Sequence, residues 1–460
     1  MITLTSSCYT FLMRYRNFTH LLQENTANHP DDPVFLYDDD GKKTITWKEF
    51  NERVTLRAKE LRMTDRTSLG ILCDGSLENV IEIFAGNNAG MQNVLLDKNA
   101  PLVLLAKQIN ATDVDLLWGG ERVKELLPFL TKGTNDTEDQ ILFFTSGTTN
   151  AAKAVTLTSA SLMASAWNGG QMLPLQEDDI LLNLLPLNHV FGFVCGLLWG
   201  MSCHAVTALG RGMRHFVDDP AYFRPTAVSL VPLLTGFFLQ HNLFNPELRQ
   251  VLIGAGDCRE ELIKAMQQKN IKVAFGYGLT ETSSGVAIST SGNPKEMDIC
   301  PDDEITLALD GEILIKAPTC MMKGYYKKPE ETREVLKDGI LYTGDLGRFT
   351  EEGKLVITGR KKDILLLPNG TKIFLPEIEA GIMNLLQSQE VAVVLKNDKP
   401  VLVTHIEKKK EEIRARLSET IKNMPRGQQF TDIIELPHPL QRTASGKIKR
   451  WEIQKEIEKL

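Results

Sequence analysis

The sequence has little cysteine, and its cysteines follow no pattern that would specify a disulfide framework or a zinc site. Seven cysteines are scattered over 460 residues, and none belongs to a C-x-x-C pair. Secreted disulfide-rich scaffolds carry even numbers of cysteines, and structural zinc sites carry them in closely spaced pairs. We therefore expect free thiols and a reducing, cytoplasmic setting.

A surplus of positive charge is also missing. The chain has 52 basic and 59 acidic residues, which gives a formal net charge of −7 at pH 7. Proteins that bind nucleic acid neutralise its phosphates with a concentrated basic surface. The charge balance therefore argues against nucleic acid as a partner.

Uninterrupted long apolar runs are absent as well, so we expect no membrane span. Residues 180–210 carry no formally charged side chain and are numerous enough to cross a bilayer. However, asparagine, proline and histidine side chains interrupt this stretch, and polar groups are costly in lipid, so we predict a buried segment of a soluble protein. Near the N-terminus, Arg14 and Arg16 follow the apolar run Ile2–Met13 instead of preceding it, which is the wrong order for a secretory signal.

The length of the chain predicts more than one domain, because single hydrophobic cores stop growing at about 250–300 residues. Strand-like and helix-like segments alternate in the first part, which is typical of an α/β fold. One β-α-β unit is predicted from the strand Ser68–Cys73, a helix capped by Ser76, and the strand Asn93–Leu96.

A second β-α-β unit places two glycine-containing segments at the same edge of a sheet. The strand Val251–Ile253 leads into "GAGD" (254–257), and the strand Ile271–Phe275 leads into "GYGLTET" (276–282), with a helix around 260–268 between them. Ligands of open α/β sheets bind beyond the carboxyl ends of the strands. The pattern therefore predicts a shared ligand site at this edge.

The pattern changes near Arg360 to short strands, turns and helices, which predicts a second, α+β domain of about 100 residues. We place the two domains at 1–359 and 360–460, with a tight hinge near Gly359–Lys362. The expected elements of the second domain are strands at 354–358, 364–367 and 372–374, a helix opened by Pro376 with Ile378, Ile382 and Leu385 or Leu386 on one face, a hairpin of 391–395 and 401–405, a charged helix, a strand at 432–436 and a final helix.

The stretch "FFTSGTTNAAKAV" (143–155) combines an apolar strand with a cluster of hydroxyl side chains and one lysine. Backbone N–H groups and hydroxyls of such loops bind phosphate. The stretch is not a Walker A loop, because Ala152 replaces the second glycine and Ala154 replaces the magnesium-binding hydroxyl. Taken alone, such a cluster favours a polar loop between strands over a phosphate site, so other parts of the chain must decide.

Several further motifs follow in a fixed order, and together they cover nearly the whole chain. They are "LPLNHVFG" (185–192), "YGLTETS" (277–283), "GEILIKAP" with "GYYKKPEET", "YTGDLG" (342–347), "GRKKD" (359–363), "LPNGTKIFLPEIE" (367–379) and "QRTASGKIKR" (441–450). With the hydroxyl loop, this series resembles the adenylate-forming enzymes of the acyl- and aryl-CoA synthetase superfamily. Asn150, Ala152 and Ala154 stand where that family usually has glycine, proline and glycine.

The resemblance implies an α/β fold: a large N-terminal domain of sheets flanked by helices, with a smaller, mobile α+β C-terminal domain. It implies an ATP-dependent acid–thiol ligase that forms an acyl-adenylate, releases pyrophosphate and transfers the acyl group to a thiol. The implied cofactors are ATP, Mg²⁺ and coenzyme A, or the phosphopantetheine of a carrier protein. A small-molecule carboxylic acid is the implied substrate.

The resemblance also implies roles for particular residues. Lys447, Thr280 and His189 are the expected catalytic residues, Glu281 is the expected magnesium ligand, and Lys362 occupies the hinge position. The expected nucleotide-binding residues are Thr145, Ser146, Gly147, Thr148, Thr149, Lys153, Gly254, Ala255, Gly256, Tyr277, Gly278, Asp345 and Arg360.

The identity of the acid and of the thiol stays open at this point. The uncharged surroundings of Phe191–Trp199 predict an apolar acyl or aryl pocket, and "LLLPNGTKIFLPEIE" favours ligases of the fatty-acid type. His189 lines that pocket or is simply a core histidine. Coenzyme A and an acyl carrier protein present the same thiol arm, and the substituted loop also fits a non-catalytic nucleotide- or acyl-binding protein.

Overall fold

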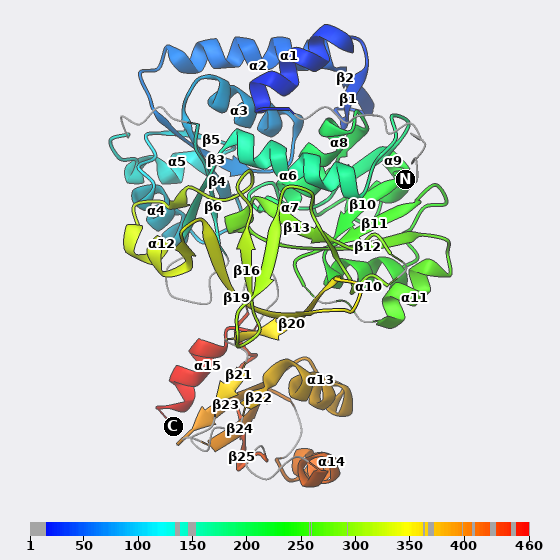
Figure 1. The fold of residues 1–460 in the computed structure, drawn as a ribbon. Helices are drawn as coiled ribbons and strands as arrows, with labels where there is room; N and C mark the ends of the chain where they lie inside the picture. The colour runs from blue at the N-terminus through cyan, green and yellow to red at the C-terminus, as the bar shows by residue number, and fades with distance from the viewer. Residues whose placement is uncertain are drawn as a thin grey trace.

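The computed structural model describes residues 15–133, 139–145, 153–256, 258, 260–291, 293–361, 364–366, 372–397, 399–406, 410–423, 429–442 and 448–459. Figure 1 shows a large part built from the first three quarters of the chain and a small part, coloured orange to red, built from the remainder. The fold is mixed α/β, with sheets flanked by helices in the large N-terminal part and a smaller α+β part at the C-terminus. This confirms the expected fold class.

Among the described residues, the widest sheet of the large part has nine strands in the order β14-β13-β12-β11-β10-β8-β9-β1-β2. Strands β8 to β12 lie parallel to one another, whereas the pairs β1–β2, β12–β13 and β13–β14 are antiparallel. The strands are β1 (Pro33–Asp38), β2 (Lys42–Thr46), β8 (Ile180–Asn183), β9 (Val206–Leu209), β10 (Ala227–Leu230), β11 (Gln250–Ile253), β12 (Lys272–Leu279), β13 (Ser284–Ile288) and β14 (Asp298–Ile299).

A second sheet has six strands within the described ranges, in the order β17-β7-β6-β4-β3-β5. It contains the predicted β-α-β unit, because β3 and β4 pair in parallel and Ser76 caps α3 (Leu77–Asn88) between them. The strands are β3 (Ser68–Cys73), β4 (Gln92–Asp97), β5 (Leu116–Trp118), β6 (Ile141–Phe144), β7 (Ala154–Leu157) and β17 (Gly324–Tyr325).

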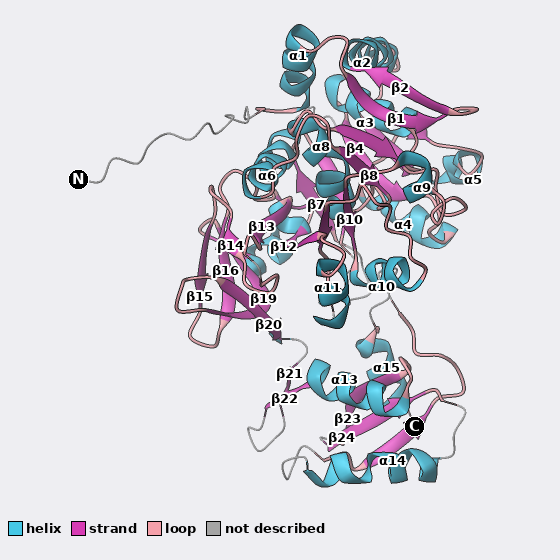
Figure 2. Cartoon of the chain, turned by 90° about the vertical axis from the view of Figure 1, so that its right-hand side faces the viewer, coloured by secondary structure: helices cyan, strands magenta, loops and turns pink. Residues whose placement is uncertain are grey.

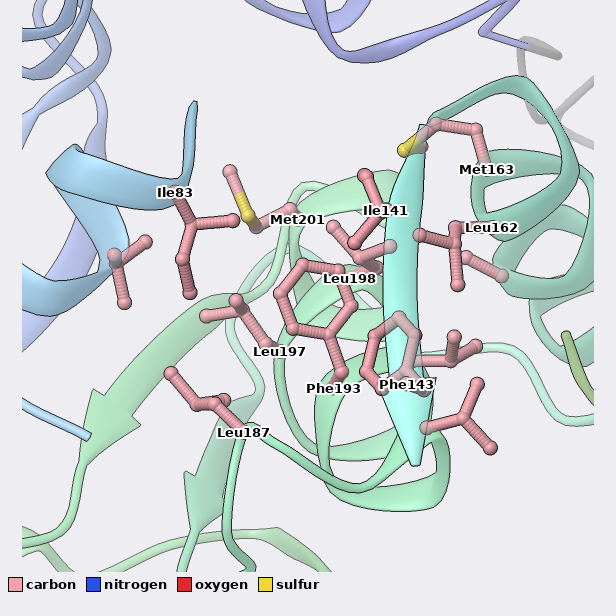
Figure 3. Packing of buried hydrophobic residues seen from close by; sticks show 14 of the residues in the cluster. Ile83, Ile141, Phe143, Leu162, Met163, Leu187, Phe193, Leu197, Leu198 and Met201 are labelled. Carbon is pink, nitrogen blue, oxygen red and sulfur yellow. The ribbon is translucent and has the colours of Figure 1, made fainter. Parts of the chain in front are cut away.

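The uncharged stretch 180–210 contains β8, α7 (Val190–Phe193), the π-helix η2 (Val194–Leu198), α8 (Trp199–Ser202) and β9. Its two strands belong to the nine-stranded sheet, and its helical residues pack between this sheet and the six-stranded sheet. Phe193 faces Phe143 of the six-stranded sheet (Figure 3). The centroids of the two rings are 5.6 Å apart. On the other side, a Cβ added at Gly200 would lie 2.3 Å from Thr207 Oγ1 of the nine-stranded sheet.

A helix that is apolar all round must be covered on every side. The two sheets cover the helical segment formed by α7, the π-helix and α8. The prediction of a buried segment is therefore confirmed. No helix within the described part of the chain is long and apolar enough to span a bilayer. A π-helical turn departs from the regular hydrogen bonding of an α-helix. Here Ser229 Oγ donates a hydrogen bond to the carbonyl oxygen of Cys195 in this turn, at 2.8 Å.

A third sheet forms the C-terminal end of the large part, up to the predicted domain boundary. Its described strands are β15 (Glu304–Leu307), β16 (Glu312–Lys316), β18 (Leu336–Lys337), β19 (Ile340–Phe349) and β20 (Leu355–Arg360). Arg360 still pairs with Asp345 on β19, so the backbone of residue 360 belongs to this sheet. The domain boundary at 359/360 stays a prediction.

The small part is a three-stranded sheet with helices on both faces (Figure 2). Alternate residues of β23 face opposite sides: Val391 and Val393 pack with α13 and α14, while Ala392 and Val394 pack with α15. The predicted hairpin is confirmed by the antiparallel pairing of β23 and β24. The elements are β21 (Ile364–Leu366), β22 (Lys372–Phe374), α13 (Leu375–Leu386), β23 (Val391–Lys396), β24 (Lys399–Thr404), α14 (Lys410–Asn423), β25 (Asp432–Glu435) and α15 (Arg450–Ile457).

In α13, Ile382 and Leu386 are buried, as the helical spacing predicts, whereas Leu385 faces solvent. The six described cysteines are free thiols. The remaining helices of the large part are α1 (Phe18–Asn28), α2 (Trp47–Arg62), α4 (Leu102–Ala111), α5 (Val123–Leu126), η1 (Leu127–Phe129), α6 (Ser159–Met172), α9 (Asp219–Phe223), α10 (Pro232–Gln240), α11 (Glu260–Gln267), η3 (Thr280–Thr282) and α12 (Pro329–Val335).

Candidate functional site

The two glycine-containing segments lie at the same edge of the nine-stranded sheet, as predicted. Strands β11 and β12 pair in parallel, with Ile253 opposite Phe275, so both chains leave the sheet side by side. The segment after β11 is Gly254–Gly256, where Ala255 adopts a left-handed backbone with φ of 62°. The segment in and after β12 holds Tyr277, Gly278, Thr280 and Glu281.

Gly278 is the residue that allows β12 to bend into this segment. The pairing of β12 with β13 shifts register between Tyr277 and Gly278, and a Cβ added at Gly278 would lie 1.5 Å from the backbone oxygen of Ser284. No side chain fits in that space. The sharp bend sets the direction in which Thr280 and Glu281 leave the strand.

Tyr277 points its hydroxyl at an ion pair whose carboxylate, Asp345, is buried. The hydroxyl donates a hydrogen bond to Asp345 Oδ2 at 2.9 Å, and Arg360 Nε lies 2.5 Å from Asp345 Oδ1. The antiparallel register of β19 and β20 sets Asp345 directly opposite Arg360. Burial, and then the negative charge of Asp345, raise the pKa of Tyr277 well above its ordinary value, so its hydroxyl is a neutral donor.

Phe191 borders the segment after β11, and His189 lies two residues before it in the chain. The ring of Phe191 lies close against Gly254, since a Cβ at that position would be 2.7 Å from its Cζ atom. His189 immediately precedes α7. Desolvation by the surrounding protein lowers the pKa of His189, so its imidazole is neutral at neutral pH.

The hydroxyl loop is held as the connection of a β-hairpin. Strands β6 and β7 are antiparallel, with Phe144 opposite Ala154, and the N–H of Thr145 donates to the carbonyl oxygen of Lys153 at 3.0 Å. The candidate residues Ser146, Gly147, Thr148 and Thr149 lie between these ends, outside the described residues.

Lys153 leaves the hairpin toward two residues from the "GYYKKPEET" motif. Its Nζ lies 3.1 Å from Glu331 Oε2 and 4.4 Å from the ring centroid of Tyr325. Tyr325 is brought there by β17, which pairs with β7 and sets Tyr325 opposite Val155. The contact of an ammonium with an aromatic face is favourable, more so when water is partly excluded.

Tyr325 also connects this lysine to Glu281. Its hydroxyl donates a hydrogen bond to Glu281 Oε1 at 2.7 Å. Burial and the neighbouring carboxylate of Glu281 raise the pKa of Tyr325, so the hydroxyl keeps its proton. Glu281 Oε2 takes no hydrogen bond from any residue that the structure describes.

The donor set fits a magnesium ion shared with phosphate. The described residues contain no group of three or more histidine, cysteine or acidic side chains that could hold a metal on its own. Mg²⁺ is typically held by one or two carboxylates together with phosphate oxygens and water. Glu281, with one free carboxylate oxygen beside the hairpin of the hydroxyl loop, suits that arrangement.

Tyr325, Glu331 and Lys361 were missed as candidate residues. Lys361 lies 2.6 Å from both Asp310 Oδ2 and Glu312 Oε2, so it fixes the end of β20 to the third sheet. The only signal in the sequence was the family motif that contains each residue. The predicted hinge residue Lys362 and catalytic residue Lys447 lie outside the described residues.

Comparison with known proteins places this geometry in context. The family model described as "AMP-binding enzyme" matches residues 131–326, which contain the hydroxyl loop, both glycine-containing segments and the first three residues of "GYYKKPEET". A 2-succinylbenzoate–CoA ligase from Bacillus cytotoxicus is 29% identical over 344 residues, which cover 70% of this chain and 71% of that protein. The corresponding ligase from Oceanobacillus iheyensis is 27% identical over 417 residues, covering 81% and 85%.

Solved structures share the fold. The o-succinylbenzoate CoA synthetase from Bacillus subtilis, in complex with its acyl-adenylate intermediate, has a TM-score of 0.80 at 22% identity, covering 94% of this chain and 97% of that one. The same enzyme with ATP and a magnesium ion has a TM-score of 0.79, also at 22% identity, covering 94% and 98%. An anthranilate CoA ligase in complex with anthranoyl-AMP has a TM-score of 0.78 at 19% identity, covering 97% and 98%.

Proposed function

We propose that this chain is an AMP-binding enzyme, and that it acts as an ATP-dependent acid–thiol ligase of the AMP-forming type. It activates an aryl or other hydrophobic carboxylic acid as the acyl-adenylate and transfers the acyl group to coenzyme A. A carboxylate is a poor electrophile, and the adenylate supplies a good leaving group. The chemistry therefore needs a site that holds ATP and stabilises negative charge at its phosphates.

One observation carries the proposal: strand β12 and its continuation connect two groups of polar side chains suited to opposite ends of a nucleotide. Tyr277 on β12 contacts the pair of Asp345 and Arg360. Four residues further on, Glu281 is linked through Tyr325 to Lys153. A carboxylate suits ribose hydroxyls, whereas an ammonium and a metal-binding carboxylate suit phosphates.

Each group then has a defined action on the nucleotide. Asp345, oriented by Arg360 and Tyr277, accepts hydrogen bonds from the ribose hydroxyls. Lys153 and the hydroxyl loop bind the β and γ phosphates. When Mg²⁺ is bound, it neutralises phosphate charge, and Glu281 is the residue that holds it. Tyr325 keeps the carboxylate of Glu281 in place through its hydrogen bond.

We assign the bridge between the incoming carboxylate and the α-phosphate to Lys447 and the hinge to Lys362. A long, compact cation suits the first role, and a few backbone dihedral angles at a hinge suffice for domain rotation. We expect Lys447→Ala to abolish adenylate formation while sparing thioester formation from presynthesised acyl-adenylate. Single-turnover assays of the two half-reactions measure this, and an equal loss in both would remove Lys447 from its assigned role.

The acid and the acceptor are proposed from the relatives. Their names specify an aryl acid and coenzyme A, so these are the first substrates to test. A fatty acid is the second class of acid, because the uncharged residues around Phe191 suit an alkyl chain as well as a ring. The relatives give no support to a carrier protein as acceptor.

ATP–pyrophosphate exchange against a panel of aryl, fatty and short-chain acids tests the proposal. We expect exchange that depends on the acid and on Mg²⁺, followed by thioester formation when coenzyme A is added. Holo carrier protein in place of coenzyme A distinguishes the two acceptors. A protein that binds ATP yet shows no exchange with any acid would be a non-catalytic relative, and the proposal would be wrong.

A further inference from the structure

Asp345, which we assign to the ribose hydroxyls, lies in a bulge of strand β19. Between two successive pairs of β16 with β19, the chain advances from 312 to 314 on β16 but from 342 to 346 on β19. Residues 343–345 therefore stand opposite the single residue 313. Bulges of this kind redirect a side chain and are frequent next to active sites. The position of Asp345 therefore depends on what holds the bulge.

Side chains accept the backbone N–H groups of this bulge. Gly344, which has a left-handed φ of 71°, donates its N–H to Glu312 Oε1 at 2.8 Å. The N–H of Asp345 donates to Thr343 Oγ1 at 3.0 Å, and that hydroxyl donates to the carbonyl oxygen of Ile313 at 2.8 Å. Glu312 is therefore the acidic side chain that fixes the backbone immediately before Asp345.

Glu312 is buried, and its second carboxylate oxygen pairs with a cation. The residue is 7% exposed, and Lys361 Nζ lies 2.6 Å from Glu312 Oε2. The same ammonium lies 2.6 Å from Asp310 Oδ2, and Asp310 Oδ1 accepts the backbone N–H of Glu312 at 3.2 Å. A buried carboxylate is strongly unfavourable when its cation is removed. Lys361 therefore holds Glu312 in place from the end of β20, where β16, β19 and β20 lie together (Figure 1).

We propose that Glu312 is a positioning residue of the nucleotide site: it holds the bulge in the form that presents Asp345 to the ribose, and Lys361 holds Glu312. The inference rests on the proposed ligase function and adds two residues that act through Asp345. Lys361 also directly precedes Lys362, the assigned hinge residue, so this carboxylate links the ribose contact to the start of the hinge.

A nucleotide without ribose hydroxyls separates this role from a purely structural one. If Glu312 only stabilised the third sheet, its loss would weaken the binding of every nucleotide to the same extent. If it acts through Asp345, its loss weakens the contact with the ribose hydroxyls and leaves the other nucleotide contacts in place.

The test compares Mg-ATP with Mg-2′,3′-dideoxy-ATP by titration calorimetry in the parent and in Glu312→Met, which keeps the side chain long and removes both acceptors. We expect the parent to bind ATP at least about tenfold more tightly than dideoxy-ATP, because hydrogen bonds to a charged group are lost. Glu312→Met should raise the Kd of ATP by roughly fivefold or more, and that of dideoxy-ATP by less than about twofold. Equal increases for the two nucleotides, or no increase for ATP, would overturn the inference.

Lys361→Met tests the second half of the proposal and does so even where Glu312→Met fails to fold. We expect it to raise the Kd of ATP by about two- to fivefold, to leave that of dideoxy-ATP nearly unchanged, and to add little to Glu312→Met in the double variant. Independent, additive increases would show that Lys361 does not act through Glu312. The matched control is Glu304→Gln, which removes a carboxylate 3.2 Å from Lys316 on the same sheet and should leave both Kd values as in the parent.

ATP–pyrophosphate exchange distinguishes a failure of this inference from a failure of the proposed function. Acid-dependent exchange in the parent, with a ratio of the two Kd values that does not respond to Glu312→Met, would leave the ligase function intact and remove Glu312 from its positioning role. A parent that neither binds Mg-ATP nor shows exchange would overturn both.

Discussion

Glu331 is predicted to compete with ATP for Lys153, and replacing it with glutamine should tighten ATP binding. The carboxylate lies 3.1 Å from the ammonium of Lys153 and 2.6 Å from that of Lys328. These two cations hold the pKa of Glu331 below its usual value, with Lys328 the larger influence, so the carboxylate is ionised at neutral pH. In the proposed function Lys153 binds phosphate, so it must leave Glu331 when ATP arrives.

The magnitude follows from the distance and the exposure of the pair. Two unit charges 3.1 Å apart attract by about 1.3 kcal/mol in bulk water. Roughly a quarter of the Lys153 side chain and a third of the Glu331 side chain are exposed, and solvent-accessible pairs of this kind contribute about 0.2–1 kcal/mol. Removing the competitor should therefore lower the Kd of ATP by about two- to fivefold, and less at high salt.

Titration calorimetry of Mg-ATP binding to Glu331→Gln measures this change. Glu330→Gln is the matched control, because it removes the same charge from the same turn of α12, while its side chain is 82% exposed and pairs with Arg333. We expect the control to bind ATP as the parent does. An unchanged or higher Kd for Glu331→Gln, or an equal decrease in both variants, would show that Glu331 does not compete for Lys153.

Three further predictions concern residues that shape the site. Gly278→Ala should lower the free energy of unfolding by at least roughly 3 kcal/mol, because its methyl group would overlap a backbone oxygen. The control Gly276→Ala, whose Cβ would lie 3.6 Å from its nearest neighbour, should change the free energy of unfolding by less than about 1 kcal/mol. Thermal unfolding measures both changes. Tyr325→Phe should lower the free energy of unfolding by about 1.5–3 kcal/mol, the usual value of a hydrogen bond to a charged group. This loss should vanish in a protein in which Glu281 is already replaced by glutamine. Asp345→Asn should raise the KM for ATP by about tenfold or more and change kcat less, and an unchanged KM would remove Asp345 from the nucleotide site.

Local patterns predicted the elements of the fold well. The strand Ser68–Cys73 and the helix cap at Ser76 were found because six consecutive residues are buried in a parallel strand and a hydroxyl side chain satisfies a free N–H at the helix start. The prediction that the segments after β11 and β12 lie at the same edge of the sheet followed from the β-α-β unit, because its two strands run parallel. Both features depend on residues close together in the sequence.

Long-range pairing could not be predicted in this way. Strand β17 has only two residues, Gly324 and Tyr325, and no periodicity marks it as a partner of β7. Yet this pairing alone brings Tyr325 beside Lys153 and Glu281. The π-helical turn at Val194–Leu198 could not be predicted either, because it is hydrogen-bonded to Ser229, which lies on the distant strand β10. The family motifs named the regions, and only the register of distant strands shows which side chains meet.

The arrangement around β12 has a consequence for how the site works. Tyr277 stands on β12, which is paired with β11 and with β13, and Glu281 follows the end of this strand by two residues. A short stretch of backbone therefore connects the residues that we assign to the ribose and to the metal. The backbone of Lys153 is hydrogen-bonded to Thr145 at the end of a hairpin, whereas its ammonium contacts the side chains of Glu331 and Tyr325. In the proposed function, this ammonium must leave Glu331 before it can bind phosphate. This is why the charge at Glu331, outside the nucleotide contacts themselves, should change ATP affinity.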